Sequence, residues 1–280
     1  MKKITRIAFL LLAYSTAVFA QTDPNTGAAL KVLHVKGDIS NKTRNKSLSL
    51  GDDIYRTDQV EVKESSSSCY FVNTKNTRYV LKGQNQGVFN LSENLMELPP
   101  RKMITQRGMS DTSHAMLSPA DIFGNDHYIF LDTVETFKLD QKFFPISNTQ
   151  QFVVRLFVGD SLYKTFKVKN QGQVVYVWTK DIKPVLRSLG EKRWLAKMEL
   201  NLLDKETGYF KTICTFKPES FEFVPIKSEL DLLVNNCKLN NLTARQTFEE
   251  AVIYIEDIYG KCNQEVLKGL LLREYKIKVD

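Results

Sequence analysis

The stretch VLHVKGDISNKTRNKSLSLGDDIYRTDQVEVKE (residues 32–64), continued by SSSSCYFVNTKNTRYVLKGQNQGVF (65–89), decides the fold of the first part of this chain. Short apolar and polar runs alternate in it, and glycines at positions 37, 51, 83 and 87 interrupt them. Runs of this kind, separated by glycine and Asn/Asp clusters, are typical of short β-strands joined by tight turns. Because no helical period separates the runs, they favour a small barrel or sandwich over a parallel sheet.

The order of these features resembles the FecR-type extracytoplasmic β-domain. It shows an opening V-x-x-V-x-G-x-I, then an SLSLGDDI turn, then TDQVEVKESSSSCYFV, and then a closing YVLKGQNQGVF. The matching residues are Val32, Val35, Gly37, Ile39, Leu48, Leu50, Gly51, Asp52, Ile54, Val60, Val62, Ser66, Ser68, Tyr70, Phe71, Tyr79 and Leu81. The resemblance implies a β fold and an extracytoplasmic setting. FecR proteins carry an anti-sigma segment and a membrane helix before this domain, whereas a cleavable signal precedes it here, so we do not expect the sigma-factor role.

The first twenty residues have the pattern of a secretory signal peptide. Lys2, Lys3 and Arg6 form its positive start, residues 7–14 are apolar, and Val18-Phe19-Ala20 is a small-residue cleavage site. The alternative is a membrane anchor, but the apolar run is too short to span about 30 Å of hydrocarbon. We therefore expect cleavage after Ala20 and export to the periplasm or the exterior, with no membrane-spanning segment in the mature protein.

Length and charge limit the classes of partner. Cleavage would leave 260 of the 280 residues, enough for two units and a small third. The net charge of +7 falls to +4 without the three cations of the signal. The other lysines and arginines are scattered, so a solvated surface is expected and nucleic-acid binding is not; attraction to an anionic cell-surface polymer stays open.

Composition divides the mature chain into four parts: a FecR-like β-domain (21–95), a connector (96–126), a β-sandwich domain (127–226) and a C-terminal helical segment (227–280). The connector contains Pro99-Pro100 and four methionines, at 96, 103, 109 and 116. Methionines adapt to irregular surfaces, so this segment either packs on the body of the protein or docks on a partner.

The sandwich domain is predicted from eight aromatic and β-branched runs. They are HYIFLDTV, TFKLD, QFVVRLFVG, LYKTFKVK, QVVYVW, WLAKMELNLLD, YFKTICTF and FEFVPI. Eight strands in about one hundred residues suit an immunoglobulin-like antiparallel sandwich, although the Cys-Trp-Cys spacing of antibody domains is missing. Residues 180–189, with Pro184 inside them, read as a short helical crossover.

The last fifty residues change to a helical period. Thr243 and Gln246 form the pattern of a capping box before an apolar stripe, Gly260 ends that helix, and Asn263 can cap the next one. Cys237 and Cys262 bracket the capped helix, so of the four cysteines these two are the predicted disulfide in an oxidising compartment. Cys69 and Cys214 lie in strand-like runs and are predicted to be buried hydrophobes.

No catalytic, cofactor-binding or metal-ligating residue is predicted. HExxH, GxSxG, P-loop and GxGxxG motifs are missing, and His34, His114 and His127 lie far apart. A catalytic dyad of a histidine with Cys69 or Cys214 is conceivable, because such partners need not be near in sequence, but no motif around either cysteine supports it. Asp52 and Asp53 are adjacent acids, which could suggest a metal or acid/base site. Adjacent residues on a strand point to opposite faces and do not share one ion easily, so Gly51 and Asp52 are interpreted as a structural turn.

Two hypotheses about function remain. The first is an exported, non-enzymatic protein that binds a partner protein or a cell-envelope glycan through its β-domains, in envelope signalling or assembly. The alternative is a hydrolase, or its accessory subunit, with a site between the two β-domains and the methionine-rich connector as a lid.

Overall fold

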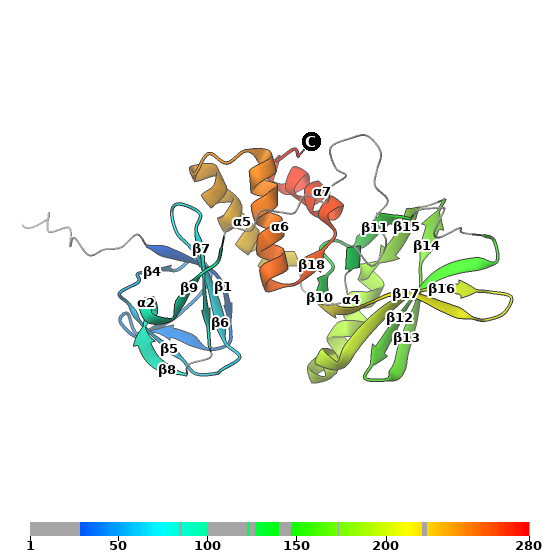
Figure 1. Cartoon of the computed structure of the whole chain (residues 1–280), viewed down its shortest axis with the longest axis horizontal. Coiled ribbons are helices and arrows are strands. Elements are labelled where there is room, and N and C mark those ends of the chain that lie inside the picture. Colours follow the sequence, from blue (N-terminus) through cyan, green and yellow to red (C-terminus); the bar gives the residue numbers. More distant parts are fainter. Residues whose placement is uncertain are drawn as a thin grey trace, which may run out of the picture. The chain divides into compact units, whose positions relative to one another are not determined.

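A computed structural model of the chain describes residues 29–83, 86–99, 122–123, 127–139, 147–172, 174–219 and 223–279. The described part is mainly β with C-terminal helices, which confirms the predicted fold class (Figure 1). The chain divides into two compact units, residues 1–99 and 100–280, so the C-terminal helices belong to the same unit as the second set of strands. The predicted signal peptide and most of the methionine-rich connector lie outside the described residues.

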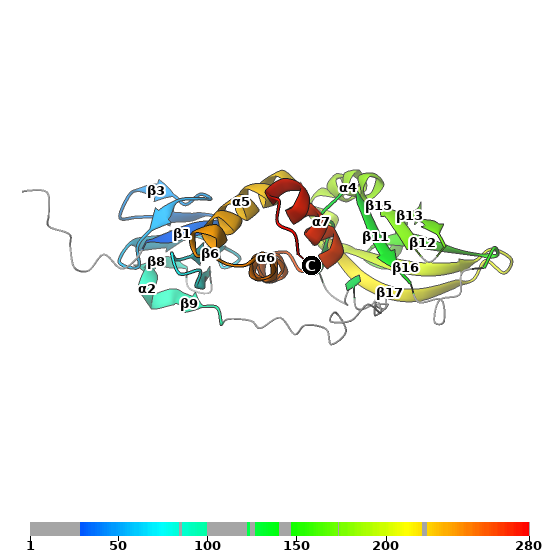
Figure 2. The same cartoon turned by 90° about the horizontal axis from the view of Figure 1, so that it is seen from above.

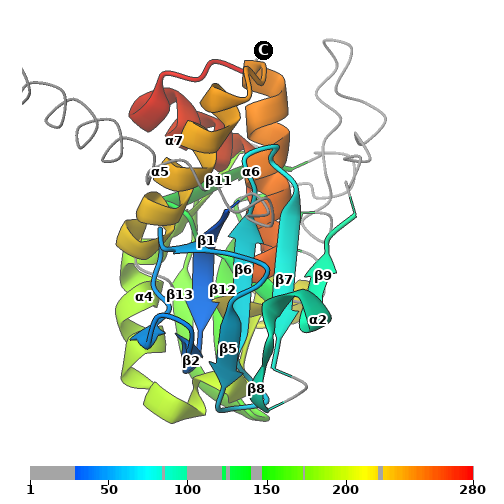
Figure 3. The same ribbon diagram turned by 90° about the vertical axis from the view of Figure 1, so that its left-hand side faces the viewer.

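The first unit consists of two small antiparallel sheets around one core. One sheet has the order β4-β1-β6-β7-β9 and the other the order β3-β2-β5-β8, and Figure 3 shows β1, β6 and β7 side by side. The elements are β1 (Leu30–Lys36), β2 (Ile39–Asn41), β3 (Lys46–Ser47), β4 (Asp53–Ile54), β5 (Gln59–Val62), β6 (Ser68–Val72), β7 (Arg78–Lys82), β8 (Gly87–Asn90), α2 (Leu91–Asn94) and β9 (Leu95–Glu97).

The alternation of the sequence places one apolar face of each sheet in this core. Val32 on β1, Ile39 on β2, Val60 on β5, Phe71 on β6 and Leu81 on β7 are all buried in one cluster. Residues two apart on a strand share a face, so the period of two in the sequence becomes one buried layer. The short strands predicted for residues 32–89 are therefore present as a two-sheet unit.

The second unit combines a six-stranded sheet, a three-stranded sheet and helices. The larger sheet has the order β13-β12-β16-β17-β10-β18 and the smaller one the order β11-β15-β14. The elements are β10 (His127–Ile129), β11 (Val134–Lys138), β12 (Gln150–Val158), β13 (Ser161–Lys167), β14 (Lys169–Gln171), β15 (Val174–Trp178), α4 (Thr179–Ser188), η1 (Gly190–Leu195), β16 (Ala196–Asp204), β17 (Phe210–Glu219), α5 (Phe223–Leu239), α6 (Ala244–Ile258), β18 (Lys261–Cys262) and α7 (Gln264–Tyr275).

One core joins the two sheets and α4. Leu156 on β12 and Met198 on β16 pack in the same buried cluster as Val177 on β15 and Ile182 on α4. The three-stranded sheet and α4 therefore lie on one face of the six-stranded sheet, which we call its inner face (Figure 2). The residues between these core positions on strands β13, β12, β16 and β17 point to the opposite face of the sheet, which we call its outer face.

Three details differ from the prediction for this unit. The run HYIFLDTV is not one strand: β10 ends at Ile129, and β11 begins at Val134 after a turn. β10 also pairs in parallel with both β17 and β18, so the larger sheet is not purely antiparallel. The run FEFVPI, predicted as a strand, includes the start of α5, where Pro225 lies in the first turn and a missing N–H costs no helical hydrogen bond.

The helix termini follow the sequence signals closely. The hydroxyl of Thr243 accepts a hydrogen bond from the Gln246 amide, and the Gln246 side chain accepts one from the Thr243 amide, which is the predicted capping box. The Asn263 side chain accepts from the amides of Glu265 and Val266 at the start of α7. Thr179–Ser188 forms the short helix expected around Pro184.

Candidate functional site on the outer face of the larger sheet

The two turn residues singled out in the sequence organise the first unit. Gly51 has φ of +85°, and its amide donates to the carbonyl of Val32 at 2.8 Å. The carboxylate of Asp52 accepts from the Ser49 amide at 2.9 Å and from Nζ of Lys46 at 2.6 Å. Burial alone would raise the pKa of Asp52, but these donors outweigh it and hold the pKa below its ordinary value. Both oxygens of the Asp52 carboxylate therefore accept hydrogen bonds from the protein itself, as expected for a structural turn.

The predicted disulfide is not formed in the structure: all four cysteines are buried free thiols. The thiol of Cys237 interacts with Thr247 in the first half of α6, whereas Cys262 follows that helix and interacts with Glu256 near its end. The two cysteines therefore have different neighbours along α6, and neither is paired in the structure.

The burial of the cysteines also makes them poor candidates for a catalytic nucleophile. Burial raises the pKa of Cys214 to about 12 and that of Cys69 well above its ordinary value. A cysteine nucleophile must ionise near neutral pH and be reachable. The Cys–His dyad written from the sequence therefore finds no suitable thiol, and among the described residues no group of three His, Cys, Asp or Glu side chains is placed to hold a metal ion.

Glu135 on β11 is a buried carboxyl group whose pKa is strongly raised. It is fully buried and accepts hydrogen bonds from the Leu131 amide at 3.0 Å and from the hydroxyl of Tyr128 at 3.2 Å. Burial raises its pKa to about 7, although these donors and the charge of Lys183 act in the opposite direction. A carboxyl with such a pKa can serve as a general acid or base where a substrate reaches it. Here its oxygens are occupied by the turn between β10 and β11, so its observed role is to fix that turn.

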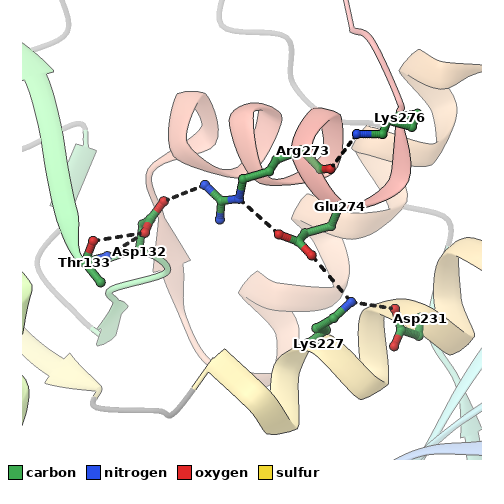
Figure 4. A network of polar contacts seen from close by, with 7 residues as sticks. All are labelled: Asp132, Thr133, Lys227, Asp231, Arg273, Glu274 and Lys276. Carbon is green, nitrogen blue, oxygen red and sulfur yellow. Dashed lines mark hydrogen bonds and ion pairs between the residues drawn. The ribbon is translucent and has the colours of Figure 1, made fainter.

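A chain of polar contacts ties the same turn to the C-terminal helices (Figure 4). Nη1 of Arg273 on α7 lies 3.2 Å from the carboxylate of Asp132, and its Nε lies 3.0 Å from Glu274. Glu274 in turn lies 3.7 Å from Nζ of Lys227 on α5. Burial would raise the pKa of Asp132, but the Thr133 amide and Arg273 outweigh it and lower the pKa. This network fixes α5 and α7 to the strands.

A second buried carboxylate, Glu229 on α5, has the same structural character. The hydroxyls of Tyr254 and Tyr259 donate to it at 2.9 and 2.5 Å, so α5 and α6 are joined through one acid. Burial and the neighbouring carboxylate raise the pKa of Tyr259. Both buried acids therefore hold elements of the second unit together.

The outer face of the larger sheet carries a different arrangement, which we call the Arg155 cluster: Arg155, Phe157, Lys197, Glu199 and Phe210. On β12, Phe152, Val154 and Leu156 point into the core, so Arg155 and Phe157 lie on the opposite face. In the sheet register Arg155 lies opposite Glu199 and Phe157 opposite Lys197 of β16. The pleat therefore places cations and rings together on one surface.

Two aromatic rings lie beside the guanidinium of Arg155. Its Cζ lies 4.8 Å from the centre of the Phe157 ring and 4.7 Å from that of Phe210 on β17. Nζ of Lys197 lies 5.0 Å from the Phe157 ring and 3.4 Å from Glu199. Contacts of a cation with a ring face are worth about 0.5–1 kcal/mol each at exposed sites, so the two rings favour this position of the guanidinium.

The charge of Arg155 is not neutralised within the described part of the chain. No described carboxylate forms an ion pair with it, and its Nε is buried without a hydrogen-bond partner among those residues. A buried donor without a partner is costly, and each such group calls for an explanation. Phe210 is 36% exposed and Leu162, on the neighbouring strand β13, is 49% exposed, so part of this surface is open to solvent.

No family model, curated protein or solved structure matches this chain. The FecR-type resemblance of residues 32–89 and the immunoglobulin-like label of the second unit therefore stay predictions. In the described part of the chain, no helix is both long and apolar enough to cross a bilayer.

The sequence prediction missed the Arg155 cluster. A signal was present, because Arg155 is the one charged residue in the run QFVVRLFVG, and a strand that buries Leu156 turns Arg155 to its other face. Phe210 lies 55 positions further along, and only the sheet order β12-β16-β17 brings it to the guanidinium.

Proposed function

We propose that this protein is an exported, non-enzymatic binding protein that recognises a partner protein or a cell-envelope glycan through its β-domains, in envelope signalling or assembly. The Arg155 cluster carries the proposal. A guanidinium that is held between two rings, lacks an acid of its own among the described residues and adjoins exposed apolar side chains is typical of a recognition surface.

Arg155 is suited to this role for a chemical reason. Its planar guanidinium presents several donors in a fixed fork that fits carboxylates, and the flanking rings hold the fork so that little side-chain entropy is lost on binding. The rings add apolar contact area beside the charge. Aromatic and arginine side chains dominate the energy of many interfaces for these reasons.

The FecR-type module would supply the extracytoplasmic setting of this function, as its resemblance implies. The hydrolase alternative gains no support from the thiols of Cys69 and Cys214 or from the carboxyl of Glu135, because burial raises the pKa values of both thiols and the Glu135 oxygens are occupied by a turn.

The test is capture from envelope extract combined with a glycan array, using the full chain, an Arg155→Met variant and a Lys169→Met variant. Lys169 is the matched control, because its Nζ lies 5.7 Å from the ring of Trp178 on the smaller sheet. We expect one protein or glycan class to be retained by the wild-type chain and by Lys169→Met, and to be lost with Arg155→Met. Background proteins and a flat array would contradict the proposal, as would a ligand that all three chains retain equally.

A further inference from the structure

The strand β13 forms one edge of the larger sheet and is exposed along most of its length. It pairs with β12 on one side, and in the sheet as described no strand lies on its other side. Of its seven residues, Ser161–Lys167, only Phe166 is buried. Leu162 and Tyr163 are 49% and 53% exposed. An edge of this kind presents unpaired backbone groups beside apolar side chains.

The register shows which backbone groups point outward. The amide of Val168 donates to the carbonyl of Phe152, and Val153 and Arg155 lie opposite Lys167 and Thr165. Bonded and non-bonded pairs alternate along an antiparallel ladder, so Val168 and Phe166 bond toward β12. Thr165 and Lys167 therefore direct their N–H and C=O groups to the open edge.

The charge of the strand selects the chemistry of an incoming segment. Lys164 and Lys167 are its only charged residues, and neither forms an ion pair within the described part of the chain. Because they are three positions apart, their side chains lie on opposite faces of the sheet. An added antiparallel strand with two acids three positions apart would place one acid beside each lysine.

A second copy of the chain fits this edge poorly. If two β13 strands paired antiparallel with full overlap, Lys164 at the centre would lie opposite its own counterpart, and like charges directly opposite each other are destabilising. Lysines on edge strands commonly prevent such self-association. The same lysines leave the edge open to an acidic strand.

We infer that β13 is a docking edge to which an acidic, extended segment of a partner protein adds as a further antiparallel strand, through backbone hydrogen bonds at Thr165 and Lys167. This inference rests on the proposed function and chooses a protein over a glycan as the partner, because main-chain pairing needs a polypeptide. The Arg155 cluster lies on the outer face of the same sheet and supplies the contact surface beyond the edge.

The probe is a fluorescent nine-residue peptide of alternating threonine and valine in which glutamates occupy the fourth and seventh positions, with blocked ends. We expect fluorescence anisotropy to show binding to the full chain, and hydrogen exchange to show protection of the Thr165 and Lys167 amides. The Lys164→Glu/Lys167→Glu variant should bind at least about tenfold more weakly, because two attractive pairs become repulsive. The peptide with lysines at the same two positions should prefer that variant.

Two controls make the result decisive. Lys138→Glu reverses a charge on β11, the edge of the smaller sheet, and should leave binding unchanged. A peptide methylated at every backbone nitrogen has no N–H to donate to the edge and should not bind. Three results would overturn the inference. They are equal binding of the methylated peptide, no binding of the acidic peptide, and protection of the Thr165 amide by self-association.

Failure of this inference is distinguishable from failure of the proposed function. If Arg155→Met abolishes capture of a partner while the acidic peptide does not bind, the edge inference alone is wrong. If the peptide binds and protects Thr165 while extract and array yield nothing, the edge is competent and the proposed envelope role is wrong.

Discussion

Replacing Glu135 by glutamine tests how the buried carboxyl shapes the stability of the second unit. The pKa of Glu135 rises from an ordinary 4.5 to about 7 because burial penalises its charged form. A pKa that is raised on folding gives stability that is complete below the unfolded value and is lost as pH rises through the folded value. At about 1.4 kcal/mol per pKa unit, ionisation costs roughly 3 kcal/mol between pH 4.5 and pH 8.

The glutamine variant mimics the protonated acid and does not ionise. We expect it to match the wild type at pH 5 within about 1 kcal/mol and to exceed it by about 2–3 kcal/mol at pH 8. Both tryptophans, Trp178 and Trp194, belong to the second unit, so their fluorescence in urea reports its unfolding specifically. Glu191→Gln, at an exposed glutamate of the same unit, is the control and should follow the wild type. Equal pH slopes for wild type and Glu135→Gln would show that ionisation of Glu135 does not destabilise the second unit.

Three further predictions concern the C-terminal helices. Thr243→Ala removes the hydroxyl of the capping box on α6 and should lower the free energy of unfolding by about 1 kcal/mol in the same urea assay, whereas an unchanged midpoint would show that the cap contributes nothing. Gly260→Ala should cost more than about 2 kcal/mol, because φ is +96° and the new Cβ would lie 2.4 Å from the carbonyl oxygen of His127. Gly269→Ala inside α7, where a Cβ meets nothing within 4 Å, should instead stabilise by up to about 1 kcal/mol; equal effects of the two substitutions would contradict the steric argument.

Local signals in the sequence predicted local structure well. The period of two in residues 32–89 produces the buried layer of the first unit, and Thr243, Gln246 and Asn263 cap the helices as their spacing indicates. These features depend on residues a few positions apart, so they can be predicted from the sequence alone. The mainly β class follows from the same periodicity.

Features that depend on distant partners could not be predicted in this way. The run HYIFLDTV is apolar enough for one strand, but a turn fixed by the buried Glu135 divides it. FEFVPI has the composition of a strand, yet part of it lies in the first turn of α5, where Pro225 is tolerated. Cys237 and Cys262 bracket a helix in sequence, but in the folded chain both are free, buried thiols.

The candidate site shows the same limit. Alternation places Arg155 on the outer face of β12, but its contact with Phe210 requires the order of three strands. The sequence also does not show that Arg155 lacks an acid partner. In the folded sheet Glu199 forms an ion pair with Lys197 at 3.4 Å, and this pair depends on how β12 and β16 align.

Quantitative capture from envelope extract, with a parallel glycan array, tests most directly whether the outer face around Arg155 binds a ligand from the cell envelope. It compares the wild-type, Arg155→Met and Lys169→Met chains after equal folding is verified by tryptophan fluorescence. We expect a ligand that the wild type and Lys169→Met retain and that Arg155→Met reduces to background. Retention of that ligand by Arg155→Met at the wild-type level would contradict this expectation.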